Sequence, residues 1–357
     1  MYHFFRRLPM QYPLTATPDL NSEQSARARQ LQLTKPPGAL GRLEEIACWF
    51  AGRQQREIPA PLKPAITVFA GDHGVVAEGI SAFPSVVTGE MVRNFARGGA
   101  AINVLSRSIG AHLTVVNVGV ASPLNDVTGI VHANIRLGTA NLLQGPAMTR
   151  QEAERAVELG RARAVSDIQI GANLLIAGEM GIGNTTPSAC LICALTGAAP
   201  EDVVGIGTGV DAAGRARKID VVREALKRVN AHPPADGIGW LAEVGGLEIA
   251  AMAGYYLEAA VSGVPALLDG FISSAAALVA LQLSPAVTDW LIASHLSFEN
   301  GHRIALEKLG LPPLIDLQMR LGEGSGAAVV VPLLQAAICL HAEMATFAEA
   351  GVSNKDG

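Results

Sequence analysis

The stretch Leu174-Leu175-Ile176-Ala177-Gly178-Glu179-Met180-Gly181-Ile182-Gly183-Asn184-Thr185-Thr186-Pro187 contains the transition that decides the fold. Its first four residues are all apolar, which is typical of a strand that is buried on both faces. Glycines and hydroxyl side chains then lead to Pro187, a residue that suits the first turn of a helix. Backbone N–H groups at such a helix start bind phosphate, so the segment predicts an anion site. Ordinary N-capping by Thr185 or Thr186 is the structural alternative.

The glycine pattern of this segment excludes two familiar nucleotide motifs. No lysine follows the glycines, so the segment is not a Walker loop, and the spacing does not match GxGxxG.

Similar apolar runs recur along the chain and are separated by Ala-rich stretches of helical length. These runs are Ile66–Phe69, Leu113–Val120, Val203–Ile206, Ala266–Leu268 and Leu291–Ala293. Strands that alternate with helices in this way form parallel sheets built from βαβ units. The sequence therefore predicts an α/β fold with a parallel sheet.

Most of these predicted strands are followed by glycine together with a polar side chain. The segments concerned are Gly71-Asp72-His73-Gly74, Gly178–Thr186, Gly205–Gly209, Asp269-Gly270 and Ser294-His295. Ligands of open α/β sheets bind outside the carboxyl ends of the strands. One such loop is common in purely structural settings, but five together favour a ligand pocket.

The heptad Arg320-Leu321-Gly322-Glu323-Gly324-Ser325-Gly326 places one carboxylate between glycines, where the backbone can turn sharply. An apolar segment from Ala327 to Leu340 follows and predicts a buried helix. The carboxylate of Glu323 can therefore come close to a ligand, or it can simply be solvated in a tight loop.

Two further segments are candidates for ligand contacts. Lys218 follows the glycine-rich loop Gly205–Asp211 and is a candidate for a phosphate or carboxylate contact. The segment Ser81–Thr88 mixes apolar and hydroxyl residues, and Phe83 with Met91 can line a slot for an aromatic ligand. A loop that packs on the sheet is the structural alternative.

Composition excludes several classes of protein. The chain has 357 residues, of which 49% are hydrophobic and 17% are charged, with a net charge of -5. The negative charge argues against nucleic-acid binding, and 4% aromatic residues argue against a base-stacking platform. The apolar stretches Ala327–Leu340 and Ala250–Ala280 are too short or too interrupted to predict membrane spans.

Cysteine and histidine usage points to a cytoplasmic protein without a metal. Cys190 and Cys193 lie in an apolar run with no second pair to complete a zinc site, so we expect buried thiols. No apolar segment follows Phe4-Phe5-Arg6-Arg7, as a secretory signal would require. The residues Asp72, His73, Asp269 and His295 match no familiar ligand spacing, and the two aspartates are better suited to holding loops or a ribose hydroxyl.

Several motifs in one order carry a resemblance to a known family. They are Leu33–Leu43, Asp72–Val75, Glu179–Pro187, Leu268–Phe271, Ser294-His295 and Arg320–Gly326. Together they resemble the nicotinate-nucleotide–dimethylbenzimidazole phosphoribosyltransferases, which act in the synthesis of the cobalamin lower ligand. The resemblance spans residues 22–345 and excludes the N-terminal arm.

The resemblance implies a Rossmann-like parallel six-stranded sheet flanked by helices, with a small helical domain built from both chain ends. On this basis we expect a large α/β domain at residues 60–310 and a small helical domain at 20–59 plus 325–350. Pro9, Pro13 and Pro18 predict an extended N-terminal arm at residues 1–19. The resemblance also implies a homodimer that needs no cofactor or metal. The implied substrates are nicotinate mononucleotide and 5,6-dimethylbenzimidazole, or related bases.

The resemblance also assigns roles to residues. Glu323 matches the catalytic glutamate of the family, and the phosphate and ribose positions match Glu179, Gly181 and Lys218, beside which we place Asn184 and Thr185. The base pocket is expected at Phe83, Met91, Leu321 and Gly322. Some relatives have polar residues around Phe83 and Met91, so the preferred base is left open.

Two other functions remain compatible with the residues. A non-catalytic binder of nucleotides or aromatic bases could use the same fold, although it would have no use for a proton acceptor at Glu323. A dinucleotide-dependent oxidoreductase is disfavoured by the absence of GxGxxG.

Overall fold

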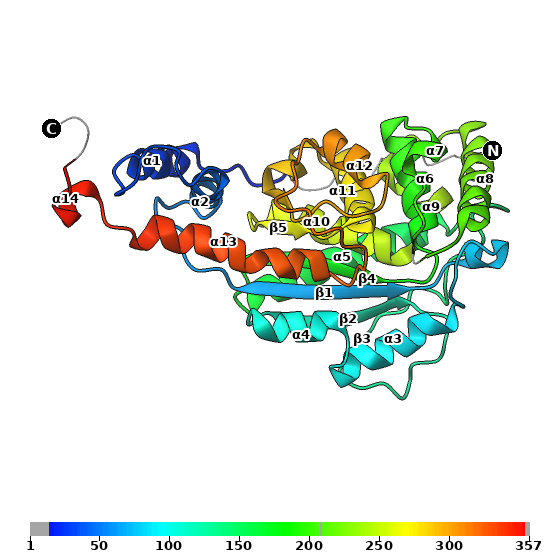
Figure 1. Cartoon of the computed structure of the whole chain (residues 1–357). Helices are drawn as coiled ribbons and strands as arrows, with labels where there is room; N and C mark the ends of the chain where they lie inside the picture. The colour runs from blue at the N-terminus through cyan, green and yellow to red at the C-terminus, as the bar shows by residue number, and fades with distance from the viewer. Residues whose placement is uncertain (1–13, 208, 354–357) are drawn as a thin grey trace, which may run out of the picture.

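The computed structural model describes residues 14–207 and 209–353, and its centre is one parallel sheet of six strands (Figure 1). The strand order is β3-β2-β1-β4-β5-β6, and every neighbouring pair is parallel. The strands are β1 Pro64–Gly71, β2 His112–Gly119, β3 Val131–His132, β4 Leu174–Met180, β5 Ala266–Leu268 and β6 Leu291–Ala293. This is the six-stranded α/β architecture that the resemblance implied.

Helices connect the strands and cover both faces of the sheet. The α-helices are α1 Leu20–Gln30, α2 Arg42–Arg53, α3 Val86–Arg97, α4 Ala101–Ser108, α5 Arg150–Gln169, α6 Thr185–Thr196, α7 Pro200–Val203, α8 Ala212–Asn230, α9 Gly237–Val244, α10 Leu247–Val261, α11 Phe271–Leu283, α12 His302–Leu309, α13 Ser325–Glu343 and α14 Phe347–Ala350. Two 3-10 helices are η1 Gly74–Glu78 and η2 Pro285–Trp290.

The strands separate two hydrophobic cores, because successive side chains of a strand point to opposite faces. In β1, Ala65 and Phe69 belong to the core that contains α5, α6, α8, α10 and α11. Ile66 and Val68 belong to the other core, which contains residues of α3, α4 and α13 as far as Ile338. All eight residues of β1 are buried, which agrees with the continuous apolar runs seen in the sequence.

One predicted strand is wrong and one strand was missed. Val203–Ile206 is not a strand: Pro200 opens the single turn of α7, and Val203 and Val204 are buried against helices instead. A run of four apolar residues cannot by itself distinguish a strand from other buried structure. The missed strand, β3, has two exposed residues at the edge of the sheet and therefore lacks an apolar run.

The helices predicted at the two chain ends are present and touch each other. The Asp19 side chain caps α1 by accepting hydrogen bonds from Asn21 and Ser22. In Figure 1, α1 and α2 lie beside α13, and α2 packs directly on it. The helix α13 also contacts β4. It therefore packs both on the sheet and on α2. The division into two domains remains a prediction.

Only part of the predicted N-terminal arm can be placed. Residues 1–13 lie outside the described part of the chain. Within residues 14–19, the Ala16 amide donates to the Ala260 carbonyl, and the Ala16 carbonyl accepts from the Trp290 indole. This short segment therefore docks on α10 and η2.

The helix α13 passes a length and composition test for a membrane span, alone among helices of the described residues. However, 56% of its apolar window is buried inside the molecule. The buried positions pack on the sheet, on α2 and on α4. This packing therefore explains the apolar character of the buried part of α13.

Candidate active site

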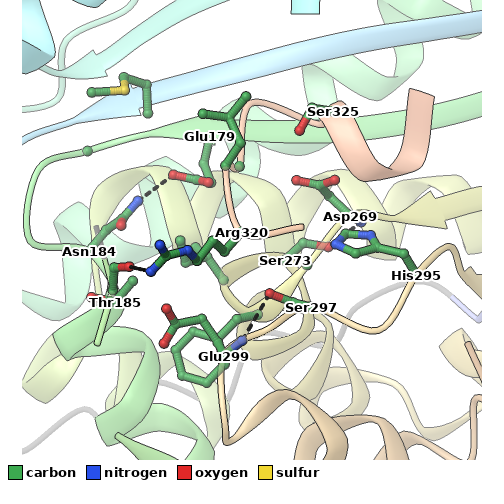
Figure 2. A pocket seen from close by; sticks show the side chains of 18 of the residues that line it. Glu179, Asn184, Thr185, Asp269, Ser273, His295, Ser297, Glu299, Arg320 and Ser325 are labelled. Atoms are coloured by element: carbon green, nitrogen blue, oxygen red, sulfur yellow. Dashed lines mark hydrogen bonds between the residues drawn. The ribbon is translucent and has the colours of Figure 1, made fainter. Parts of the chain in front are cut away.

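The carboxyl ends of β4, β5 and β6 border a cleft that joins segments remote in sequence (Figure 2). Its lining comes from the segment after β4, the start of α11, the loop after β6 and the loop before α13, together with Gly207. It encloses about 700 Å³ of empty space, its open mouth included. Four of the five segments singled out above at the ends of predicted strands contribute to it.

Glu179 ends β4 and lies in this cleft with its side chain almost completely buried. The Asn184 amide donates a hydrogen bond to the Glu179 carboxylate. Burial, together with the neighbouring carboxylates of Asp269, Glu248 and Glu323, raises the pKa of Glu179 to about 8 against the opposing effect of the Asn184 hydrogen bond. Glu179 is therefore protonated at neutral pH and can donate a hydrogen bond to a ligand.

Glycines allow the loop before α13 to pass very close to β4. A Cβ atom on Gly178 would lie 2.2 Å from the Glu323 carbonyl oxygen, and one on Gly322 would lie 2.2 Å from the Glu179 carboxylate. The Glu323 amide donates to the Glu179 carbonyl at 3.3 Å. Gly178 and Gly322 are thus required where β4 and the loop before α13 touch.

Glu323 sits in this loop in a backbone conformation that L-residues rarely adopt. Its φ is 64°, between Gly322 at 84° and Gly324 at 86°. A non-glycine residue in this region costs conformational energy and is often found at functional sites.

The Glu323 carboxylate is buried and lies at the start of α4. It accepts a hydrogen bond from the Ile102 amide at 3.1 Å. Burial raises the pKa of Glu323, and the Ile102 N–H opposes that rise. Its neighbours Gly322 and Ser325 line the cleft, but Glu323 itself is not among the lining residues. Its side chain instead occupies the α4 side of the loop.

Two aspartates at strand ends hold loops, as the sequence suggested. Asp269, after β5, accepts hydrogen bonds from the amides of Gly324 at 3.2 Å and Ala327 at 3.0 Å. It thereby ties the start of α13 to the sheet. Burial raises the pKa of Asp269 to about 7, against the effect of these amides. Asp72, after β1, accepts from the Ala121 amide at 2.8 Å.

The two histidines of the strand-end motifs also have protein partners. His73 pairs with Glu248 at 2.8 Å, and both side chains are fully buried. His295 lies 3.0 Å from the Ser294 hydroxyl and lines the cleft. No group of three or more His, Cys, Asp and Glu side chains that could hold a metal occurs among residues 14–207 and 209–353.

Lys218 approaches the cleft from α8. Its side chain is only 2% exposed, and its ammonium donates to the Thr185 hydroxyl at 2.8 Å. Burial lowers the pKa of Lys218 to about 8, while Glu299 opposes this change. Thr185 and Asn184 line the cleft at the start of α6, where the sequence predicts an anion site. The capping alternative is wrong, because Asn184 is the N-cap and no side chain caps the helix.

Several cleft residues were not identified as functional from the sequence, among them Arg320, Ser297 and Glu299. Arg320 belongs to the heptad but was given no role, and it donates to the Gly207 carbonyl at 3.4 Å. Ser297 and Glu299 follow β6 and line the cleft. The polar residues after Ser294-His295 could have indicated Ser297 and Glu299, but a sequence does not show where side chains point.

The four residues predicted for the base pocket are divided. Leu321 and Gly322 line the cleft, whereas Phe83 and Met91 do not. Phe83 is 48% exposed in the loop before α3, and Met91 packs from α3 against the core that contains α4 and α13. A hydrogen bond of 3.1 Å from the Ile182 amide to the Thr88 hydroxyl joins α3 to the cleft segment. Met91 thus lies on the face of the sheet that also carries α4, whose Ile102 amide binds Glu323.

Comparison with known proteins identifies the family. A family model described as "Phosphoribosyltransferase" matches residues 15–352. A nicotinate-nucleotide–dimethylbenzimidazole phosphoribosyltransferase of Chromobacterium violaceum is 62% identical over 94% of this chain and 97% of its own length. The chain belongs to this family.

A second relative and a solved structure support the same assignment. The enzyme of the same name from Pseudomonas aeruginosa is 53% identical over 94% of this chain and 96% of its own length. The crystal structure of CobT from Thermus thermophilus superposes with a TM-score of 0.90, at 52% identity over 94% of this chain and 99% of that one. The family fold therefore extends over nearly the whole chain.

Proposed function

We propose that the chain transfers the phosphoribosyl group of nicotinate mononucleotide to 5,6-dimethylbenzimidazole, giving α-ribazole 5′-phosphate and nicotinate. The observation that carries this proposal is the buried Glu323 carboxylate, held between two glycines in a left-handed conformation beside the cleft. The names of the relatives supply the substrates.

The chemistry needs one proton acceptor. The bond between the anomeric carbon and the pyridinium nitrogen breaks, and its electron pair neutralises the pyridinium, so nicotinate leaves without the help of an acid. The unprotonated ring nitrogen of dimethylbenzimidazole forms the new bond from the opposite face, with inversion. The proton on its other nitrogen must then be removed, and we assign that step to Glu323.

The surroundings of Glu323 suit this role. Burial makes a carboxylate more basic than it is in water, and the Ile102 amide keeps it aligned. Its negative charge also favours positive charge that develops on the ribose in the transition state. The neighbouring Glu179, which is protonated at neutral pH, cannot accept the proton as readily.

The nucleotide is proposed to lie in the cleft. Lys218 and Thr185 meet at the start of α6, where a helix N-terminus favours a phosphate. Glu179, Gly181 and Asn184 are placed on the ribose side. The base is proposed to contact Leu321, Gly322, Phe83 and Met91, of which Met91 packs in the core that contains α4. The reaction needs no metal or cofactor.

Two further properties are proposed from the family and the composition. The high apolar fraction at low charge density supports a homodimer, and the free, buried thiols of Cys190 and Cys193 suit a cytoplasmic location.

The test is direct. The protein is incubated with nicotinate mononucleotide and dimethylbenzimidazole, and the products are separated by chromatography. Formation of α-ribazole phosphate with an equal amount of nicotinate supports the proposal. Binding of either substrate without product would favour the alternative, a non-catalytic binder of nucleotides or bases.

A further inference from the structure

A buried carboxylate in the cleft has no role in the chemistry described so far. Glu299 follows β6, is 6% exposed and lines the cleft together with Thr185, Gly207 and Arg320. Its Oε2 atom has no hydrogen-bond partner among the described residues. In Figure 2 its carboxylate lies on the Thr185 and Arg320 side of the cleft. A buried carboxylate with an unsatisfied oxygen is costly unless it interacts with a positive charge.

The glycine-rich loop between α7 and α8 packs against both Glu299 and Lys218. A Cβ atom on Gly205 would lie 2.0 Å from the Glu299 Oε2. A Cβ atom on Gly207, whose φ is 56°, would lie 3.1 Å from the Lys218 Nζ and 3.2 Å from the Thr185 hydroxyl. The first glycine therefore makes room for the carboxylate, and the second lies against the ammonium.

Other charged groups at this loop have partners of their own: Asp211 accepts from the Gly214 amide at the start of α8, and Arg215 donates to the Val204 carbonyl. Burial raises the pKa of Glu299, and Lys218 from α8, the Gly207 amide and Arg320 from the loop before α13 oppose that rise. Glu299 is in turn the carboxylate that opposes the desolvation of Lys218. The nearby His295 and His302 have their pKa values lowered by burial, that of His302 to about 3, so both rings are uncharged at neutral and alkaline pH.

We infer that Glu299 is a positioning residue that keeps the buried Lys218 ammonium charged, so that it can bind the phosphate of the nucleotide. A lysine in this environment loses its proton easily, and an uncharged lysine would bind a phosphate poorly. The inference rests on the proposed function, because it takes nicotinate mononucleotide as the ligand of the cleft. The inference has a specific consequence: the negative charge of Glu299 next to the anion site allows the anion to bind at higher pH.

The pH dependence follows from the proton on Lys218. Affinity for the nucleotide should fall as pH rises through the pKa of Lys218, which is about 8. Removing the negative charge of Glu299 lowers that pKa further. The fall in affinity should therefore begin at lower pH in E299Q, by about one pH unit. A loss of packing alone would weaken binding equally at every pH.

The experiment measures the dissociation constant of nicotinate mononucleotide by calorimetry from pH 6.5 to 9.5, with the full chain. The variants are E299Q, E299D, K218R and, as a matched control, E307Q at an exposed carboxylate of α12. We expect the affinity for nicotinate mononucleotide to fall at lower pH in E299Q than in wild type. In E299D and E307Q it should fall at nearly the same pH as in wild type, and in K218R it should not fall over this range. If E299Q does not fold, E299A gives the same comparison.

The contrary results are distinct. If nucleotide affinity in folded E299Q or E299A falls at the same pH as in wild type, the inference is overturned and the proposed function stays intact. A fall that persists in K218R would show that another group is responsible and would also overturn it. Failure of wild type to bind the nucleotide at any pH would refute the proposed function together with this inference.

Discussion

Replacing Gly178 by alanine tests the close approach that positions Glu323. The new Cβ atom would lie 2.2 Å from the Glu323 carbonyl oxygen, whereas real Cβ contacts below 3.0 Å essentially never occur. One of the two segments must therefore move by the difference, about 0.8 Å. β4 is paired with β1 on one side and β5 on the other, so the loop that carries Glu323 should be the segment that moves.

The expected cost is larger for catalysis than for folding. Overpacking of this kind destabilises proteins by about 1–3 kcal/mol, which a domain with this much buried core can tolerate. A catalytic group misplaced by about 1 Å can lose about 10²-fold in rate. We therefore expect G178A to fold with a lowered melting temperature and to lose about 10²-fold in kcat.

The assay follows product formation at saturating substrates and records circular dichroism on the same sample. The control is G145A, because a Cβ atom on Gly145 would meet no atom within 4 Å and its φ is not positive. That variant should match wild type in both measurements. A folded G178A with kcat within threefold of wild type would refute the idea that this contact sets the position of Glu323.

Three other predictions concern the cleft and the assembly. K218A should raise KM for nicotinate mononucleotide about tenfold or more, because a charge-assisted hydrogen bond to phosphate is lost; an unchanged KM in the folded variant argues against that contact. Light scattering at micromolar concentration should give the mass of a dimer, and the mass of a monomer would contradict the proposed assembly. Activity should survive dialysis against a chelator; loss of activity that a single divalent ion restores would show that a metal takes part.

The sequence predicted the central part of the fold well. The strands β1, β2, β4, β5 and β6 are apolar runs, because a parallel sheet covered by helices buries both faces of its strands. The edge strand β3 is short and exposed, so no hydrophobic signal marks it. The run at Val203 shows the opposite error, since burial alone produced a strand-like pattern in a segment that packs between helices.

The candidate site was predicted through its glycines more than through its charged residues. Gly178 and Gly322 stood out in the sequence, and the structure shows that each permits a contact that a side chain would block. The contributions of Arg320 and Glu299 depend on where loops remote in sequence meet, and local patterns do not contain that information. The same limit explains why Phe83 and Met91 were grouped with Leu321, although neither of them lines the cleft.

The most direct test of the central claim is the kcat of E323Q, measured beside the dissociation constant for dimethylbenzimidazole. Glutamine keeps the size of the side chain and can still accept the hydrogen bond from the Ile102 amide, but it cannot take a proton. Loss of a general base costs about 10²–10⁴-fold in rate, while binding should change far less. We predict a fall in kcat of that size with nearly unchanged affinity for the base. A folded E323Q with kcat within a few-fold of wild type would contradict the account and would direct the search for the base to Glu179.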